Sequence, residues 1–159
     1  MDFYFDTKDL EAFMRESNWI EGEREEALQG KLHKNDLKAS YNFLNSDLSE
    51  KSLKKLHKLL AYDRPILRGD YRDVDVEIGG NLAPRPFLVK ELMHNLFLDI
   101  HKFNSWEAHI KFEKIHPFED LNGRTGRLVW AHKFLRERGF LPKSFLQQFY
   151  YQSISNFKG

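Results

Sequence analysis

The sequence contains no cysteine, and this absence excludes disulfide bridges, thiolate catalysis and cysteine-ligated zinc. It also lacks an excess of either charge, because 25 lysines and arginines face 24 aspartates and glutamates, for a net charge of +1. A balanced chain has no bulk attraction to nucleic acid or to a membrane, so neither is expected as a partner. No apolar run is long enough to span a bilayer, and no basic segment followed by an apolar run suggests a signal peptide. We therefore expect a soluble, cytoplasmic protein.

What the sequence does have is enough apolar material for one core. Its 159 residues are 41% hydrophobic and 14% aromatic, which suits a single domain over residues 1–159. Apolar residues recur with a helical period along most of the chain, which predicts an all-α fold. The first helix is expected to be capped by Asp6 or Thr7 and to fray at Ser17-Asn18, before a charged stretch over residues 23–30. Two further helices are marked by two apolar sets, which are Leu37, Tyr41 and Leu44, and Leu53, Leu56 and Leu60.

One segment alternates apolar and polar residues with the two-residue period of a strand. It runs from Val74 to Ile78 and is followed by Gly79-Gly80-Asn81. This pattern predicts a short hairpin, and because two strands alone make no stable sheet, the hairpin is expected to stand apart as a flap.

After the hairpin, the sequence predicts a central and well-buried helix, because its apolar residues form a wide stripe. A second helix, capped by Ser105, is expected through Phe112 and Ile115, a third from Gly123 to Gly139, and a last one after Pro142. The stripe of the central helix consists of Val89, Leu92, Met93, Leu96, Phe97 and Ile100.

The densest set of chemically active residue types is HPFEDLNGRTGR, over residues 116–127. Pro117 disfavours one continuous helix here, so the stretch predicts a tight loop that leads into a helix N-terminus. The N–H groups and the positive dipole end of a helix suit anions, above all phosphate. Arg124 and Arg127 lie three residues apart on one helix face and could both reach that anion. With Asn122-Gly123 beside them, they favour a di- or triphosphate.

Three more residues of the motif bear on the chemistry. Gly126, one turn inside the helix, costs about 1 kcal/mol relative to alanine, which indicates a packing or ligand reason for it. Asp120 is placed for a divalent cation on the phosphates, and Mg²⁺ suits this place because it needs few protein ligands. His116 is a base with a reference pKa of about 6.5 that can take a proton from a hydroxyl. The motif predicts transfer of part of a nucleotide to an alcohol.

Each of these residues also has an ordinary structural explanation. A lone histidine more often packs at a helix end, Asn-Gly is often only a turn, and two arginines three apart usually form a solvated helix face. The order and spacing of the whole set, and no single residue, favour the functional interpretation.

The motif resembles the signature of Fic-domain proteins, His-x-Phe-x-(Asp/Glu)-(Gly/Ala)-Asn-(Gly/Lys)-Arg-x-x-Arg. This resemblance implies a helical core with a hairpin flap, and transfer of AMP from ATP to a protein hydroxyl with loss of pyrophosphate. It implies that His116 is the general base, that Phe118 anchors the loop in the core, and that Asp120 holds Mg²⁺. The nucleotide-binding residues that it implies are Leu121, Asn122, Gly123, Arg124 and Arg127.

Leu121 departs from the signature, which usually has glycine or alanine at this position. A loop that curls around phosphate can need a backbone angle that a γ-branched side chain resists. Leucine would be accommodated there with its side chain turned outward. Altered nucleotide choice, an altered transferred group and weak activity all stay open.

Two other stretches are similar to parts of Fic proteins. Residues 69–81 resemble the flap, which holds a target segment by β-augmentation. SNWIEG resembles the inhibitory motif (Ser/Thr)-x-x-x-Glu-(Gly/Asn), inside an N-terminal inhibitory segment of about residues 6–30. The resemblance implies that Glu21 pairs with Arg127 and takes the guanidinium that should bind the γ-phosphate. The inhibitory residues are Ser17, Glu21 and Gly22, and the docking residues of the flap are Val74, Asp75, Val76, Glu77 and Ile78.

Four functions compete. The leading hypothesis is an autoinhibited, Mg²⁺-dependent AMP transferase that acts on a hydroxyl of a target protein, with self-modification left open. The second is removal of AMP from a modified protein with the help of Glu21, and the third is a nucleotide-binding interaction module with little activity, which Leu121 favours. A metal-dependent phosphohydrolase is a distant fourth, because no dense cluster of ligands accompanies His116 and Asp120. A second copy of the chain stays open as a partner through the aromatic residues of the C-terminal segment.

Overall fold

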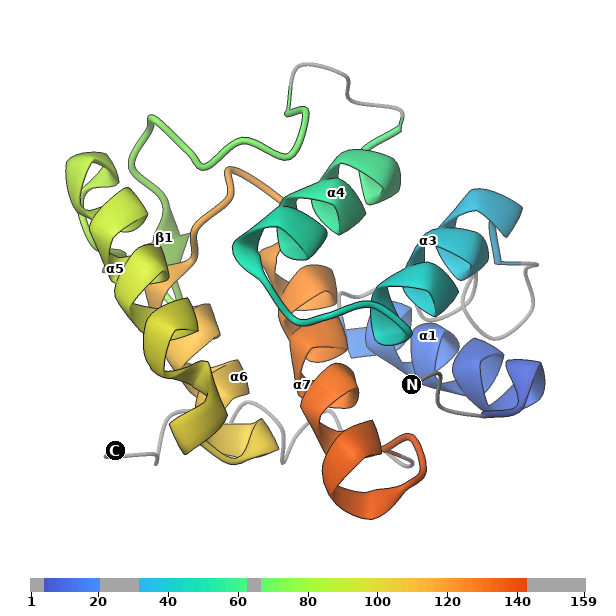
Figure 1. Ribbon diagram of the computed structural model, residues 1–159. Helices are drawn as coiled ribbons and strands as arrows, with labels where there is room; N and C mark the ends of the chain where they lie inside the picture. The colour runs from blue at the N-terminus through green and yellow to red at the C-terminus, as the bar shows by residue number, and fades with distance from the viewer. Residues whose placement is uncertain (1–4, 21–31, 63–66, 143–159) are drawn as a thin grey trace.

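The structure is a computed structural model that describes residues 5–20, 32–62 and 67–142 of the chain. It is helical with one small hairpin, so the predicted all-α fold with a hairpin is confirmed (Figure 1). The charged stretch over residues 23–30 and the predicted helix after Pro142 lie outside the described residues. The described elements are α1 (Thr7–Ile20), α3 (Lys34–Leu44), α4 (Glu50–Leu60), β1 (Glu77–Ile78), β2 (Asn81–Leu82), α5 (Pro86–Asp99), the 3₁₀ turn η1 (Ile100–Lys102), α6 (Ser105–Ile115) and α7 (Asn122–Arg138).

Polar side chains set where two of these helices begin. Ser49 forms a capping box with Ser52 at the start of α4, in which each serine oxygen accepts the backbone N–H of the other at 3.1 Å. The side chain of Asn104 caps α6 by accepting from Glu107 N at 2.9 Å, so the cap lies one residue before the predicted Ser105. Local capping therefore explains these two boundaries.

The first helix is longer than its sequence predicts. Fraying at Ser17-Asn18 was expected there, but α1 continues to Ile20. The reason is tertiary packing, because Ser17 and Ile20 are both buried and α1 lies against α3 and α7. Packing of an apolar face commonly outweighs weak local preference at a helix end.

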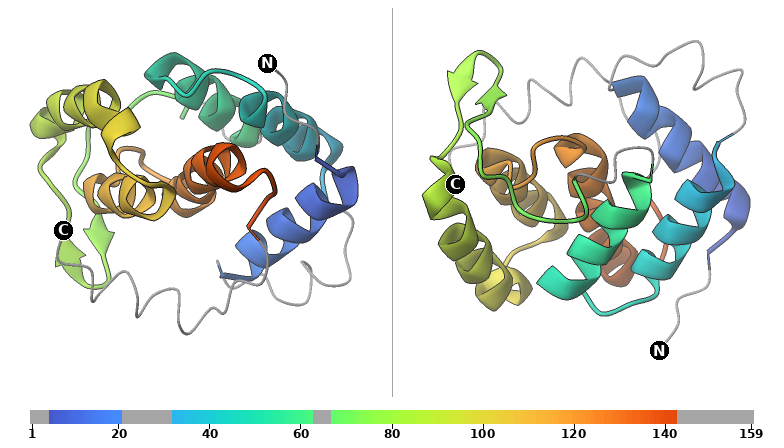
Figure 2. Two further views of the ribbon diagram at one scale, coloured as in Figure 1. Left: turned by 60° about the horizontal axis from the view of Figure 1, so that its bottom comes forward. Right: turned by 90° about the horizontal axis from the view of Figure 1, so that it is seen from above.

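The centre of the fold is α7 and not α5. Figures 1 and 2 show α7 among the other helices and α5 at one edge. The helix α7 packs against α1, α3, α4 and α6, whereas on α5 Phe87 is 80% exposed and Leu98 is 63% exposed. The prediction of a central, well-buried α5 is therefore wrong. Its apolar stripe buries only one face, which includes Val89 and Met93, against the rest of the core.

The hairpin is shorter than the alternating segment. Its strands pair Glu77 with Leu82 and Ile78 with Asn81, and Ala83 N donates to Val76 O at 2.9 Å beyond them. Gly79 and Gly80 form the turn with φ of +55° and +84°, as the tightest hairpin turns require. Val74 and Asp75 precede the strands. The hairpin projects from the helices as expected of a flap (Figure 2).

Among the helices within the described ranges, none combines the length and the apolar character needed to cross a membrane.

Candidate active site

The signature motif forms the connection between α6 and α7, over residues 116–121, and the first turns of α7. Asn122 closes this loop with both ends of its side-chain amide: Phe118 N donates to Oδ1 at 2.8 Å, and Nδ2 donates to Phe118 O at 2.7 Å. Asn122 is buried, so it fixes the shape of the loop. Its part in binding the nucleotide stays a prediction.

Phe118 anchors the loop in the core, as predicted. Its ring is fully buried and stacks on His57 with 3.8 Å between ring centroids, and Tyr71 packs beside it at 5.7 Å. The ring nitrogen Nε2 of His57 lies 3.0 Å from Asp120 O. Because a carbonyl oxygen only accepts, Nε2 carries the proton and donates. Burial lowers the pKa of His57 to about 4, so the ring is neutral at pH 7.

His116 is held in one orientation at the end of α6. Its N–H donates to Phe112 O at 3.0 Å, and its ring Nδ1 lies 3.0 Å from Glu113 O. The carbonyl fixes the proton on Nδ1, so Nε2 keeps its lone pair. The side chain is 22% exposed, and the Glu113 carboxylate lies 3.8 Å from Nδ1. This arrangement suits a ring that accepts a proton at Nε2 and is stabilised by the carboxylate once charged.

Leu121 occupies the N-cap position of α7 in a left-handed conformation, with φ +68° and ψ +16°. The unusual backbone angle that its departure from the signature suggested is therefore present. Its side chain is not turned outward, however, because it is 7% exposed and belongs to the core. Leucine has no oxygen to cap the first N–H groups of α7, unlike Ser49 on α4 and Asn104 on α6. This helix start is suited to an external anion.

The two arginines of the motif do not lie together on an open face. Arg127 is 1% exposed, and its guanidinium donates to Ser17 on α1, from Nε to Oγ at 2.6 Å and from Nη2 to the backbone oxygen at 3.0 Å. Arg124 is half-buried and lines a cavity of about 20 Å³ with Ser17 and Asn18. The structure thus brings Ser17, the first residue of the predicted inhibitory motif, to Arg127. Glu21 and Gly22 lie outside the described residues.

Gly126 has a packing reason. A Cβ atom at this position would collide with the Glu113 carboxylate and the Phe112 ring of α6. The backbone oxygen of Gly126 also accepts from His109 Nδ1 at 2.8 Å. Close approach of α6 and α7 therefore explains this glycine without a ligand.

Asp120 is exposed, and its Oδ1 accepts from Leu121 N at 2.7 Å. Within the described part of the chain, no three or more histidine, aspartate or glutamate side chains gather closely enough to hold a metal ion. A single carboxylate is still compatible with Mg²⁺, which takes most of its ligands from phosphates and water. The proposed Mg²⁺ site stays a prediction on Asp120.

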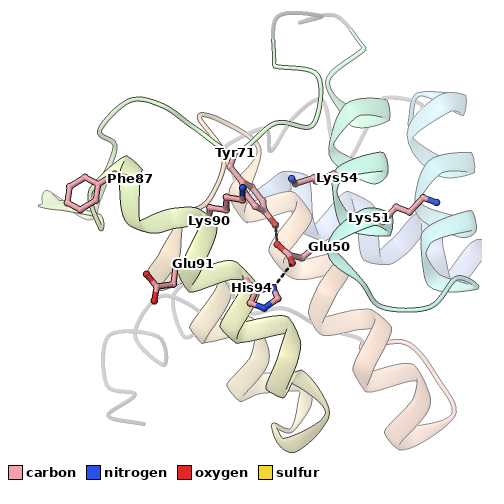
Figure 3. Close-up of a pocket in the computed structure, with 8 residues that line it drawn as sticks. All are labelled: Glu50, Lys51, Lys54, Tyr71, Phe87, Lys90, Glu91 and His94. Atoms are coloured by element: carbon pink, nitrogen blue, oxygen red, sulfur yellow. Dashed lines mark hydrogen bonds and ion pairs between the residues drawn. The ribbon is translucent and has the colours of Figure 1, made fainter.

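A groove of about 770 Å³ lies between α4 and α5 and is also lined by Tyr71. Figure 3 shows Tyr71 and Glu50 pointing toward each other, joined by a hydrogen bond of 2.5 Å from the tyrosine hydroxyl to Oε1. Lys54 Nζ lies 4.1 Å from the Tyr71 ring centroid, and His94 Nδ1 lies 3.9 Å from Glu50 Oε2. These contacts fix Tyr71, which in turn supports Phe118.

Sequence reasoning missed His57 and Arg72, which both contact the loop. His57 could have been found, because it lies on the apolar face of α4 with Leu53, Leu56 and Leu60, where a histidine needs a partner. Arg72 stands in an irregular segment whose pattern gives no signal of burial.

The chain matches known proteins in two comparisons of sequence. A sequence profile described as the Fic/DOC family matches residues 47–135, more than half of the chain. A protein adenylyltransferase Fic of Drosophila grimshawi is 32% identical over 119 residues, which cover 66% of this chain and 24% of that protein. A protein adenylyltransferase Fic of Aedes aegypti is 30% identical over 115 residues, which cover 62% of this chain and 21% of that protein. The chain thus spans about a quarter of the length of these curated relatives.

Solved structures share the fold. A Fic family protein from Desulfovibrio desulfuricans G20 superposes with a TM-score of 0.68 at 24% identity, over 84% of this chain and 49% of that one. Fic-1 from C. elegans superposes with a TM-score of 0.66 at 23% identity, over 94% of this chain and 55% of that one. The helical arrangement around the loop is therefore one that occurs in other proteins.

Proposed function

Because the chain belongs to the Fic/DOC family, we propose that it is an autoinhibited protein adenylyltransferase, which moves AMP from ATP to a hydroxyl side chain of a target protein. The observation that carries the proposal is His116 at the end of α6, held with Nδ1 as the donor and Nε2 as the acceptor, on the loop that starts α7. A base and an anion-binding helix start on one loop are the two parts that this reaction needs.

In the proposed transfer of AMP, every bond formed or broken and the transferred proton are accounted for. His116 Nε2 takes the proton of the acceptor hydroxyl, and the oxygen forms a bond to the α-phosphorus of ATP. The bond from that phosphorus to the bridging oxygen breaks, and pyrophosphate leaves. The N–H groups at the start of α7, with Asn122, Gly123 and Arg124, are proposed to bind the phosphates. When bound, Mg²⁺ supplies positive charge that neutralises the phosphates, and Asp120 is the residue proposed to hold it.

Autoinhibition is supported by the contact between Ser17 and Arg127. A buried guanidinium that donates to α1 is not available to a γ-phosphate unless that contact opens. Glu21 follows Ser17 by four residues, and a carboxylate paired with Arg127 would strengthen the block. Most residues of the hairpin over residues 77–82 are exposed, so an acceptor segment can reach it, with Val74 to Ile78 as proposed docking residues.

The test is incorporation of label from α-labelled ATP into protein in the presence of Mg²⁺. We expect weak labelling by the native chain, strong self-labelling by Glu21→Gly, and loss of that labelling when His116→Ala is added. Ser17→Ala should raise labelling above the native level, because it removes the hydroxyl that accepts from Arg127 Nε. Glu16→Gly is a matched control for Glu21→Gly, since it removes a carboxylate from the same N-terminal segment outside the inhibitory motif.

Other outcomes point to the alternatives. If removal of AMP from a modified protein requires Glu21, the reverse reaction is supported. This reaction is the second candidate function because Ser17, in the same predicted inhibitory segment as Glu21, contacts Arg127. ATP binding without turnover in Glu21→Gly would instead support an interaction module.

A further inference from the structure

Arg72 lies between α4 and β1, and it is a buried arginine whose guanidinium donates hydrogen bonds to four backbone carbonyl oxygens. It is 5% exposed, although arginine is rarely buried without partners. Two of its contacts run to the loop: Nε donates to His116 O at 2.6 Å, and Nη2 donates to Ile115 O at 3.2 Å. Its backbone N–H donates to Pro117 O at 2.9 Å. Three consecutive carbonyl oxygens at the start of the loop therefore point at one residue.

These contacts lie at the C-terminal end of α6. Carbonyl groups at such an end have no partners in the helix and carry the negative end of its dipole. His116 N satisfies Phe112 O, and Arg72 satisfies Ile115 O. A guanidinium offers several donors in a fixed planar fork, which an ammonium group does not. Arg72 is thus the charged cap of α6.

The same guanidinium also binds both arms of the hairpin. Nη1 donates to Val74 O at 2.9 Å before β1, and Nη2 donates to Pro84 O at 2.6 Å after β2. One side chain therefore bonds both arms of the hairpin and the loop. The hairpin and the loop are far apart in sequence, so this link is tertiary and not local.

His116 needs such support because its backbone is strained. It has φ +52° and ψ +62°, which costs a residue with a side chain about 1–2 kcal/mol. Pro117 follows it, and a residue before proline is pushed toward extended conformations. Hydrogen bonds from Arg72 to the carbonyls on either side of this residue hold it in place.

We propose that Arg72 is a positioning residue for the reaction, which joins both arms of the hairpin to the left-handed backbone of His116 and so holds the acceptor segment and the base in one fixed relation. This inference rests on the proposed function for its role in transfer. The positioning itself is a property of the fold that can be measured without any substrate.

The first experiment measures the tautomer of His116 by ¹⁵N NMR of the full chain with labelled histidine. In the native protein, the nitrogen shifts should report a proton fixed on Nδ1. In Arg72→Gln and Arg72→Lys, they should move toward the average of the two tautomers, because the ring leaves Glu113 O. Arg136→Gln is the matched control, since Arg136 also donates to carbonyl oxygens, Leu44 O at 3.0 Å and Ser46 O at 3.2 Å, far from the loop. Native shifts in both Arg72 variants would overturn the proposal.

The second experiment measures self-labelling from α-labelled ATP in the Glu21→Gly background. Arg72→Lys and Arg72→Gln should each lower the maximal rate about tenfold or more, with the KM for ATP changed less than about threefold. Arg136→Gln should lower thermal stability but keep the rate within about twofold. A rate loss in Arg136→Gln as large as in the Arg72 variants would show that Arg72 acts through stability alone and would overturn the proposal.

The two experiments separate the two inferences. If Glu21→Gly itself incorporates no label, the proposed function fails, and the tautomer measurement still decides whether Arg72 positions His116. Should Arg72→Gln not fold, Arg72→Lys keeps the charge and the stem in the same space, and the decision then rests on that variant.

Discussion

At the scale of single residues, the loop is bounded by two strained positions. His116 and Leu121 both have positive φ, at +52° and +68°, and neither is glycine. Backbone strain of this kind persists only when neighbouring groups hold it, and it is common at functional sites. Here Arg72 holds one end of the loop and the side-chain amide of Asn122 closes the other.

Leu121 gives a prediction with two opposing terms. Leu121→Gly relieves the left-handed strain but also removes a buried side chain, and the lost burial is larger, at about 2–4 kcal/mol. Leu121→Ala loses nearly the same burial and keeps the strain. We therefore expect both variants to be less stable than the native chain, with Leu121→Gly more stable than Leu121→Ala by up to about 1 kcal/mol.

Urea unfolding of matched pairs of variants measures this difference. Leu128 is also buried on α7 but lies inside the helix, so Leu128→Ala should be more stable there than Leu128→Gly by about 1 kcal/mol. The same Ala-over-Gly order at both positions would contradict the role of strain at Leu121.

The residues of the site were predictable from sequence to different degrees. The motif in register was enough to select His116, Asp120 and both arginines, because the signature lies within twelve consecutive residues. The motif alone could not predict that Arg127 is buried against Ser17, 110 positions away. The resemblance of residues 17–22 to the inhibitory motif implied a contact of that segment with Arg127, through Glu21. Arg72 was missed because its hydrogen-bond partners are backbone oxygens, which every residue has, so no pattern of side chains announces them.

At the scale of elements, the pair α6 and α7 carries the site, and its closeness depends on Gly126. The space that a side chain would need there is filled by Glu113 and Phe112. Close packing of this kind tolerates added volume poorly.

We expect Gly126→Ala to lower the unfolding free energy by about 1–3 kcal/mol, although alanine is the better helix former by about 1 kcal/mol. A double-mutant cycle with Glu113→Ala measures the cause, because removing the carboxylate vacates part of the space. The cost of Gly126→Ala should be smaller in the Glu113→Ala background. A stabilising effect of Gly126→Ala alone would mean that α6 and α7 separate freely.

Element existence was easier to predict than element position. Periodicity located α3, α4, α5, α6 and α7, since each buries a stripe of its own residues. It placed α5 at the centre, because a wide stripe looks the same whether one or several neighbours cover it. The exposed Phe87 and Leu98 show that only one face of α5 is covered. How many neighbours a helix has is decided by the whole fold.

At the scale of the whole molecule, three buried histidines connect separate segments. His57 on α4 donates to Asp120 O, His109 on α6 bonds to Gly126 O, and His132 on α7 bonds to Ser46 O at 2.7 Å. Burial lowers the pKa of all three, to about 4 for His57, about 3 for His109 and about 4 for His132. Each is neutral in the folded state.

Acid should therefore unfold the protein more readily than its carboxylates alone would require. The unfolded chain binds protons on these histidines near pH 6.5, but the folded protein does not until about pH 4 or below. Stability from the neutral rings is complete above pH 6.5 and is lost as the pH falls from 6.5 to about 4. The loss approaches about 1 kcal/mol per pH unit for each histidine.

Urea unfolding between pH 7.5 and 4.5 checks this slope. His132→Gln should flatten it by about one histidine's share. Equal slopes in the native protein and in this variant would contradict the assignment.

Groups from distant segments stabilise the loop, and this limits whether the twelve residues of the motif can work in another protein. The left-handed His116 relies on Arg72 from beyond α4, the ring of Phe118 relies on His57 of α4, and Arg127 is covered by α1. A peptide that carries only residues 105–138, or the motif grafted between two helices of another scaffold, lacks all three supports. Such a peptide would contain the full signature sequence, yet His116 and Leu121 would relax to negative φ. Engineers who wish to move this loop to another protein must move its surroundings with it.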